Sequence, residues 1–285
     1  MLVAIVSLVS IAGVACSLLT SVEGLSDGAV ADGGAGQGSD GEAGAAETST
    51  PGDGGDASSW CTTHKGDASF CEDFDTQGLT RWDDVGQSGG ATATNDTTNP
   101  SSAPFALLSE VPALSGGGSS EAYVARRFPS AAKDLWVEAE FRLEKASTAT
   151  QTLDLLVLVQ RSPLEPDKQA WEVGFRLNGT TRKLEFFQYN FFNGAFSTFF
   201  TFPPPFPVDT WTRIGVRLEV TSNLSGNVDI DINGTRVATA VVVQPIFAMA
   251  PFQLIIGAAY VKSPQTGWTV RTDNVLFDAG GGSRP

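Results

Sequence analysis

From Phe70 onward, apolar and polar residues alternate with a period of two, and Gly, Pro, Asn and Asp separate the alternating runs. No stretch of this part has apolar residues at helical spacing, so the pattern predicts an all-β domain. We expect thirteen strands, at residues 69–75, 103–111, 121–128, 134–144, 152–160, 170–178, 183–192, 195–202, 210–220, 226–233, 235–243, 252–260 and 268–278. That number over this length favours a two-sheet antiparallel jelly-roll sandwich.

Two Asn-Gly pairs, at 193–194 and 233–234, lie between alternating runs and predict tight two-residue hairpins. With the first pair as a two-residue loop, one face of the aromatic ribbon carries Phe187, Tyr189 and Phe191 and should be core. The other face carries Gln188, Asn190 and Phe192, a mixture of amides and rings. Sugars present CH faces to rings and hydroxyls to amides, so this second face predicts a glycan groove. A face covered by other chain segments and a protein contact remain alternatives.

The same parity can be applied to two neighbouring strands. It places Leu135 to Leu143 inside at every second position, and likewise Trp171 to Leu177. If these strands share the ribbon's sheet, the groove collects a larger set of outward side chains. These glycan-binding candidates are Trp136, Glu138, Arg142, Arg176, Gln188, Asn190 and Phe192.

The segments "DTWTRIGVRLEV", "GNVDIDINGTRVAT", "FQLIIGAAY" and "WTVRTDNVLFDA", with "FCEDFD" as the first strand, resemble concanavalin A-like lectin and glucanase domains (laminin G-like jelly rolls) over residues 70–279. The resemblance implies a concave sheet that holds a glycan. It is better evidence for the fold than for an activity.

The enzymes of that superfamily have motifs that this chain lacks. Its glucanases use a Glu-x-Asp-x-x-Glu strand, whereas "EAEFRLE" has no Asp, and the pair Glu138 and Glu140 reads better as an ion-paired face. Lyases of similar fold use a Gln-x-His strand and a Tyr-Lys-Tyr region, of which "YVKSPQTGW" supplies Tyr260 and Lys262. We therefore expect no catalytic residues and a non-catalytic carbohydrate-binding protein. A glycoside hydrolase or polysaccharide lyase of the same fold, or a structural protein-contact module, is the alternative.

We expect no cofactor. A structural calcium ion is a weak alternative, at "DIDING" (residues 229–234) or at Asp73, Asp75 and Asp273, where related domains join their first and last strands. The spacing of "DIDING" fits a hairpin better, because Ile230 and Ile232 alternate as in a strand.

The first sixteen residues, "MLVAIVSLVSIAGVAC", predict a signal peptide. Gly13 to Cys16 resembles a bacterial lipobox, which implies lipidation of Cys16 and a membrane-anchored protein of the cell envelope. Conventional cleavage with secretion, or retention as an anchor, remain alternatives. In each case the protein is exported.

Residues 17–58 contain eight acids, eleven glycines and no Lys or Arg, which predicts a disordered linker before a domain at 59–285. The remainder of the chain has 24 acids against 18 bases, so nucleic acid is not an expected partner. We expect a monomer that contacts the membrane only through its N-terminal lipid. Cys61 and Cys71 should form a disulfide in an exported protein.

Overall fold

The computed structural model describes residues 59–128, 132–162, 168–222, 225–244, 250–262 and 265–280. The predicted signal peptide with Cys16 and the predicted linker lie outside the described residues. In the described part, one short helix precedes fifteen strands. The elements are α1 (Trp60–His64), β1 (Phe70–Glu72), β2 (Asp84–Ser88), β3 (Thr92–Asp96), β4 (Ala106–Val111), β5 (Ser119–Phe128), β6 (Asp134–Lys145), β7 (Thr152–Arg161), β8 (Gln169–Asn178), β9 (Lys183–Asn190), β10 (Ala195–Pro205), β11 (Trp211–Ser222), β12 (Ser225–Ile232), β13 (Thr235–Val243), β14 (Phe252–Lys262) and β15 (Trp268–Asp278).

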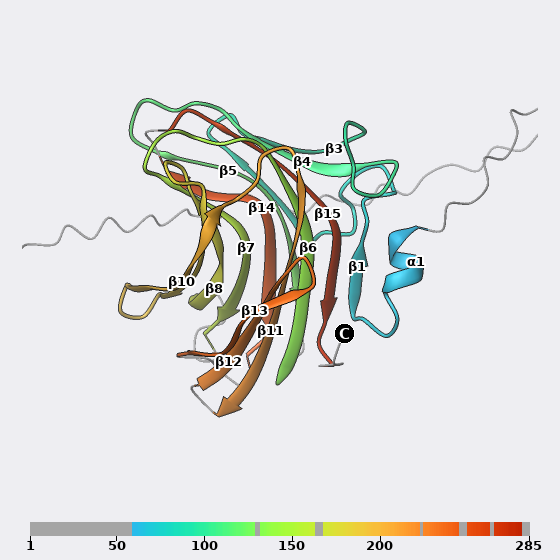
Figure 1. Ribbon diagram of the computed structural model, residues 1–285, viewed down its shortest axis with the longest axis vertical. Helices are drawn as coiled ribbons and strands as arrows, with labels where there is room; N and C mark the ends of the chain where they lie inside the picture. The colour runs from blue at the N-terminus through green and yellow to red at the C-terminus, as the bar shows by residue number, and fades with distance from the viewer. Residues whose placement is uncertain are drawn as a thin grey trace, which may run out of the picture. The chain divides into compact units, whose positions relative to one another are not determined.

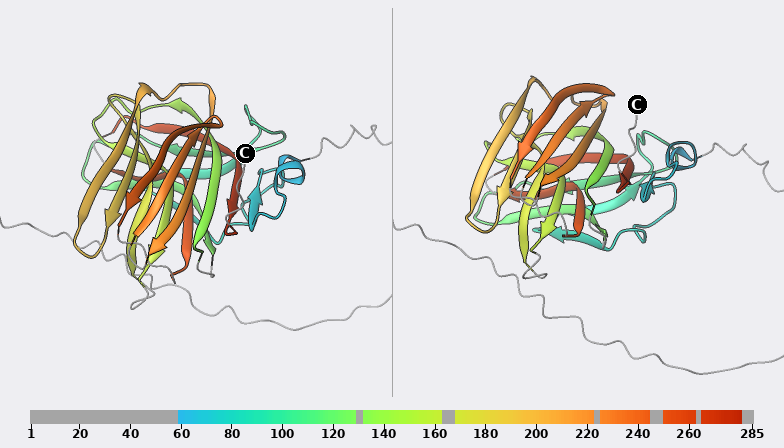
Figure 2. Two further views of the ribbon diagram at one scale, coloured as in Figure 1. Left: turned by 60° about the horizontal axis from the view of Figure 1, so that its bottom comes forward. Right: turned by 90° about the horizontal axis from the view of Figure 1, so that it is seen from below.

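The strands form two antiparallel sheets that pack face to face (Figure 1; Figure 2). The eight-stranded sheet has the order β13-β12-β11-β6-β15-β4-β3, and β1 also pairs with β15. The seven-stranded sheet has the order β10-β9-β8-β7-β14-β5-β2. The predicted all-β two-sheet sandwich is confirmed.

The core lies between the sheets and follows the predicted parity on two strands. On β6, Leu135, Val137, Ala139, Phe141 and Leu143 are fully buried, as are alternate residues of β8 from Trp171 to Leu177. All belong to one apolar cluster that joins the inner faces of both sheets. Burial of large apolar side chains at every second position is what holds the two sheets together.

The prediction for the aromatic hairpin was wrong in its register. Asn190 pairs with Ala195, so the loop has four residues, Phe191 to Gly194, rather than two. Two side chains form hydrogen bonds with the loop backbone: Asn190 Oδ1 accepts the N–H of Phe192, and Asn193 Oδ1 accepts the N–H of Ala195. These Asx contacts stabilise the longer turn. The second pair forms the predicted two-residue hairpin, with Ile232 paired with Thr235.

The faces of β9 were also predicted the wrong way round. Phe186 pairs with Phe175 of β8 and Gln188 with Val173, so Phe186 and Gln188 point into the sandwich. Phe187 and Tyr189 point out of it. The strand begins Lys183-Leu184-Glu185, and the predicted parity would have placed the Glu185 carboxylate in the core, where an ion costs several kcal/mol. The observed parity buries Leu184 instead.

Candidate site on the outer face of the seven-stranded sheet

A hollow lies on the outer face of the seven-stranded sheet, over β7, β8, β9 and β14. Its apolar floor belongs to a second apolar cluster, separate from the core, of which Phe187 and Tyr260 line the hollow. The cluster consists of Ala125, Val157, Val159, Phe187, Ile255 and Ala259, with Tyr123 and Tyr260 packed against it. These strands are therefore apolar on both faces. A sheet that faced only water would carry polar side chains here, so the apolar floor marks a special surface.

The hollow encloses about 460 Å³ and is bordered by rings, carboxyl groups and cations together. Its lining is Gln151, Thr152, Asp154, Glu172, Arg176, Phe187, Tyr189, Phe191, Phe196, Tyr260 and Lys262. The volume lies within the range of pockets for small organic ligands, and the walls combine apolar area with a few convergent polar groups.

Two carboxyl groups in the hollow have pKa values that are raised to neutral pH or above it. Burial raises the pKa of Glu172 to about 8, and the charge of Asp154 raises it further. Burial also raises the pKa of Asp154 to about 7, although Arg176 and Lys262 act in the opposite direction. Glu172 Oε2 is buried and has no hydrogen-bond partner within the described chain. An unpaired buried carboxyl oxygen is destabilising for folding alone, which makes it a candidate for ligand contact.

Two tyrosines also have perturbed phenols. Burial, followed by the charge of Glu172, raises the pKa of Tyr260, and a hydrogen bond with Gln169 partly lowers it. Burial and then Glu121 raise the pKa of Tyr123 to about 12. Both phenols therefore remain protonated at neutral pH and can donate hydrogen bonds or protons.

Arg176 is held rigidly at the border of the hollow. Its Nε lies 2.9 Å from Glu185 Oε2, and its Nη2 donates to Thr198 Oγ1 at 3.2 Å. The guanidinium carbon lies 4.1 Å from the ring centroid of Phe196 and 5.4 Å from that of Phe187. A guanidinium that is paired and stacked in this way keeps a fixed position, ready for an anionic or hydroxylated ligand.

The structure separates the predicted groove residues. Trp136, Glu138 and Arg142 belong to β6, which is in the eight-stranded sheet, so they cannot share a groove with β9. Trp136 is buried against the Cys61–Cys71 segment. The carboxyl group of Glu138 lies 3.9 Å from Arg213, and Arg142 pairs with Asp209 at 3.3 Å.

The three candidates on the hairpin also fail to form the predicted groove. Gln188 is only 4% exposed, and its side-chain amide donates to the carbonyl of Gln244. Asn190 holds the hairpin loop, and Phe192 lies exposed in that loop. Of the seven predicted residues, only Arg176 borders the hollow.

Sequence reasoning missed most of the hollow for identifiable reasons. Phe187 and Tyr189 were assigned to the core with the reversed parity of β9. Asp154 carried a usable signal, because it is the one acid in the apolar run "TLDLLVLVQ". Tyr260 and Lys262 were noted as part of a lyase region, but nothing in the sequence placed them beside Glu172.

The predicted disulfide is confirmed: Cys61 and Cys71 are joined, with their Cα atoms 5.8 Å apart.

Among the described residues, no group of three or more His, Cys, Asp or Glu side chains is arranged to hold a metal ion. Asp73 instead accepts the N–H of Cys61, and Asp273 those of Ser101 and Ser102. No helix within the described ranges has the length and apolar character needed to cross a membrane.

No family model matches the sequence, and no curated protein is significantly similar to it. Solved structures do share its fold. An endo-β-1,4-glucuronan lyase from the fungus Trichoderma reesei matches with a TM-score of 0.54 at 16% identity, covering 74% of this chain and 95% of the lyase. An alginate lyase from Chlorella virus gives a TM-score of 0.52 at 12% identity, covering 74% and 99%. A marine alginate lyase from Aplysia kurodai gives 0.53 at 9%, also covering 74% and 99%. The chain thus has a jelly-roll sandwich fold similar to that of these polysaccharide lyases.

Proposed function

We propose that this protein binds an extracellular polysaccharide that contains uronic acids, in the hollow on the outer face of the seven-stranded sheet. The observation that carries the proposal is the convergence of exposed rings, two cationic side chains and two carboxyl groups with raised pKa values on one apolar floor. Aromatic rings would pack against sugar CH faces, and the polar side chains would give directional hydrogen bonds.

The charges of the hollow favour an acidic sugar over a neutral one. At neutral pH Glu172 is mostly protonated and Asp154 is about half protonated, so neither repels a carboxylate strongly. Lys262 is exposed at the border and supplies a positive charge. The names of the structurally similar lyases, which refer to glucuronan and alginate, are consistent with this ligand class.

Binding is tested with the full chain, using affinity electrophoresis in gels that contain alginate, glucuronan or a neutral glucan. We expect retardation by one of the acidic polymers, and we expect Lys262→Ala to reduce it at least fivefold. Lys145→Ala is the matched control, because Lys145 is also exposed but lies on β6 of the other sheet. The proposal would be contradicted if both variants lost retardation equally, or if none of the polymers retarded the wild-type protein.

A second candidate function, cleavage by β-elimination, is favoured by one further observation. Tyr260 and Lys262 come from the same strand and line the same hollow. In this reaction a base removes the proton on C5 beside the uronate carboxylate, a C4–C5 double bond forms, and an acid protonates the departing O4. Tyr260 is suited to the acid role because its raised pKa keeps the phenol protonated, and Asp154, which is about half ionised at neutral pH, is the candidate base.

The two functions are distinguished by the ultraviolet absorbance of the unsaturated product. If the protein cleaves, Tyr260→Phe should lower product formation at least 100-fold and leave retardation in the gel unchanged. If it only binds, the wild-type protein should retard without releasing product. The non-catalytic function predicted from the sequence then stands.

We further propose that the protein works at the cell envelope or outside the cell, as a monomer tethered through Cys16. Support for this comes from the sequence of residues 1–58 alone. Metabolic labelling with a fatty-acid analogue, with Cys16→Ser as control, tests the tether.

A further inference from the structure

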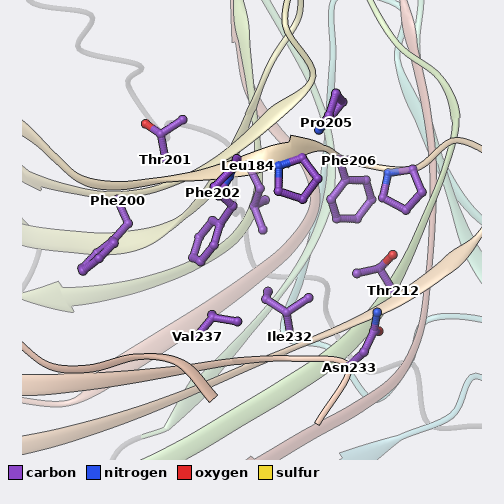
Figure 3. A pocket seen from close by; sticks show the side chains of 13 residues that line it. Leu184, Phe200, Thr201, Phe202, Pro205, Phe206, Thr212, Ile232, Asn233 and Val237 are labelled. Atoms are coloured by element: carbon purple, nitrogen blue, oxygen red, sulfur yellow. The ribbon is translucent and has the colours of Figure 1, made fainter. Parts of the chain in front are cut away.

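A second cavity, of about 640 Å³, opens between the two sheets. It lies where β9 and β10 of one sheet face the β12–β13 hairpin of the other. Figure 3 shows Phe200 and Phe202 pointing from β10 toward Val237 and Ile232 on the opposite sheet. The polysaccharide hollow and this cavity share no lining residue.

The strand geometry explains why the cavity is open. A β-bulge at Phe199 shifts the register of β10, so that Phe200 pairs with Phe186 and turns toward the interior. Phe200 is nevertheless 38% exposed and Val237 is 42% exposed, because β10 and β13 end their sheets and the inner faces part there. Large apolar side chains on the inner faces of two packed sheets normally bury each other. Between β10 and β13 they leave an open apolar space instead.

One polar group at the inner end of the cavity lacks a partner. Thr212 of β11 is 4% exposed, and its Oγ1 is buried without a hydrogen-bond partner in the described part of the chain. In Figure 3 it lies beside Phe206 and Asn233 at one end of the cavity. A buried hydroxyl without a partner is destabilising, and a ligand with a hydrogen-bonding end would satisfy it.

We propose that this cavity binds a small, uncharged, elongated apolar molecule that has one hydroxyl or carbonyl end. The apolar body lies between the phenylalanines of β10 and the aliphatic side chains of the β12–β13 hairpin, and the polar end bonds to Thr212 Oγ1. Every residue that lines the cavity within the described chain is uncharged, so a free carboxylate or an ammonium group would find no counter-ion. The volume matches a chain of medium length, such as a fatty alcohol or an ester.

The test uses the full-length protein and the neutral dye Nile red, whose fluorescence increases in apolar sites. We expect saturable binding that 1-decanol displaces. Val237→Trp should fill the mouth of the cavity and weaken dye binding at least tenfold. Val242→Trp is the matched control, since Val242 lies on the same strand and is 52% exposed but does not line the cavity. Absence of saturable binding, or equal weakening by both tryptophans, would overturn the proposal.

Thr212→Val tests the polar end separately, because valine keeps the shape and removes the hydroxyl. We expect the affinity for 1-decanol to fall about fivefold, as for the loss of one neutral hydrogen bond, and the affinity for 1-chlorodecane to change less than twofold. The variant should fold at least as well as the wild type, since an unpaired hydroxyl has been removed. Equal affinity changes for the two competitors would refute the assigned role of Thr212.

Discussion

The outer faces of the two sheets carry charged residues in opposite ways. On the eight-stranded sheet, several acids form close ion pairs with arginines: Glu140 with Arg213 at 2.7 Å, Asp134 with Arg217 at 2.6 Å and Glu144 with Arg271 at 2.7 Å. On the seven-stranded sheet, Glu172 and Asp154 are buried, have raised pKa values and form no ion pair with another described residue.

We interpret the paired charges as structural and the unpaired carboxyl groups as candidates for ligand contact. A carboxylate in a closed ion pair has its hydrogen-bonding capacity filled by the protein, whereas a carboxyl group with an unpaired oxygen over an apolar floor does not. The two glutamates that look most like a catalytic pair in the sequence, Glu138 and Glu140, lie on the paired face. The groups that border a hollow lie on the other sheet.

Glu140→Ala is expected to have the largest effect on stability. It removes the acceptor for two bonds from Arg213 and one each from Asn274 and Ser101, all partly or fully buried. We expect a loss of about 3 kcal/mol in the free energy of unfolding, measured by urea denaturation. Glu138→Ala is the control on the same strand, and it should cost less than about 1 kcal/mol because its ion pair is 3.9 Å long. If the two variants lost equal free energy of unfolding, the ion pair and hydrogen bonds of Glu140 would not stabilise the fold more than those of Glu138.

Replacing Cys61 and Cys71 together by serine is expected to cost about 2.5 kcal/mol, from the chain entropy of a loop with a sequence separation of 10. The disulfide-bonded segment packs on Trp136, so the lost stabilisation affects the outer face of the eight-stranded sheet. Retardation by the acidic polymer should not change. A loss of polysaccharide binding in the folded double variant would mean that the two faces are not independent.

Glu172→Gln should have a smaller effect, and its sign depends on pH. Because the folded pKa is raised, the protonated group stabilises the fold below its ordinary pKa, and this contribution is lost as the pH rises through about 8. We therefore expect the variant to be more stable than the wild type by about 1–2 kcal/mol at pH 9 and about equal at pH 5. Asp273, whose pKa burial raises to about 7, titrates in both proteins and cancels in the difference. A difference that does not vary with pH would contradict the raised pKa.

Much of the fold could be predicted from the sequence, because on strands such as β6 and β8 the alternation of apolar and polar residues allows only one choice of the inward face. β2 and β3 were missed, since "DVGQS" and "TATND" have almost no apolar residues to alternate, and α1 is a single turn. β9 has rings on both faces, which hid its parity, and Glu185 near its start is a charged residue that marks the outward face. The site could not be predicted, because sheet membership decides which outward side chains meet, and pairing of distant strands leaves no local signal.

The proposed polysaccharide site lies on the outer face of the seven-stranded sheet. Backbone amide spectra of isotope-labelled protein, recorded by nuclear magnetic resonance during titration with an acidic oligosaccharide, test it most directly. We expect the largest shifts on β7, β8 and β14, at Asp154, Glu172 and Tyr260, and no change in the amides around Glu140 and Arg213. Shifts concentrated on β6 and β11, with those of β8 unmoved, would contradict it.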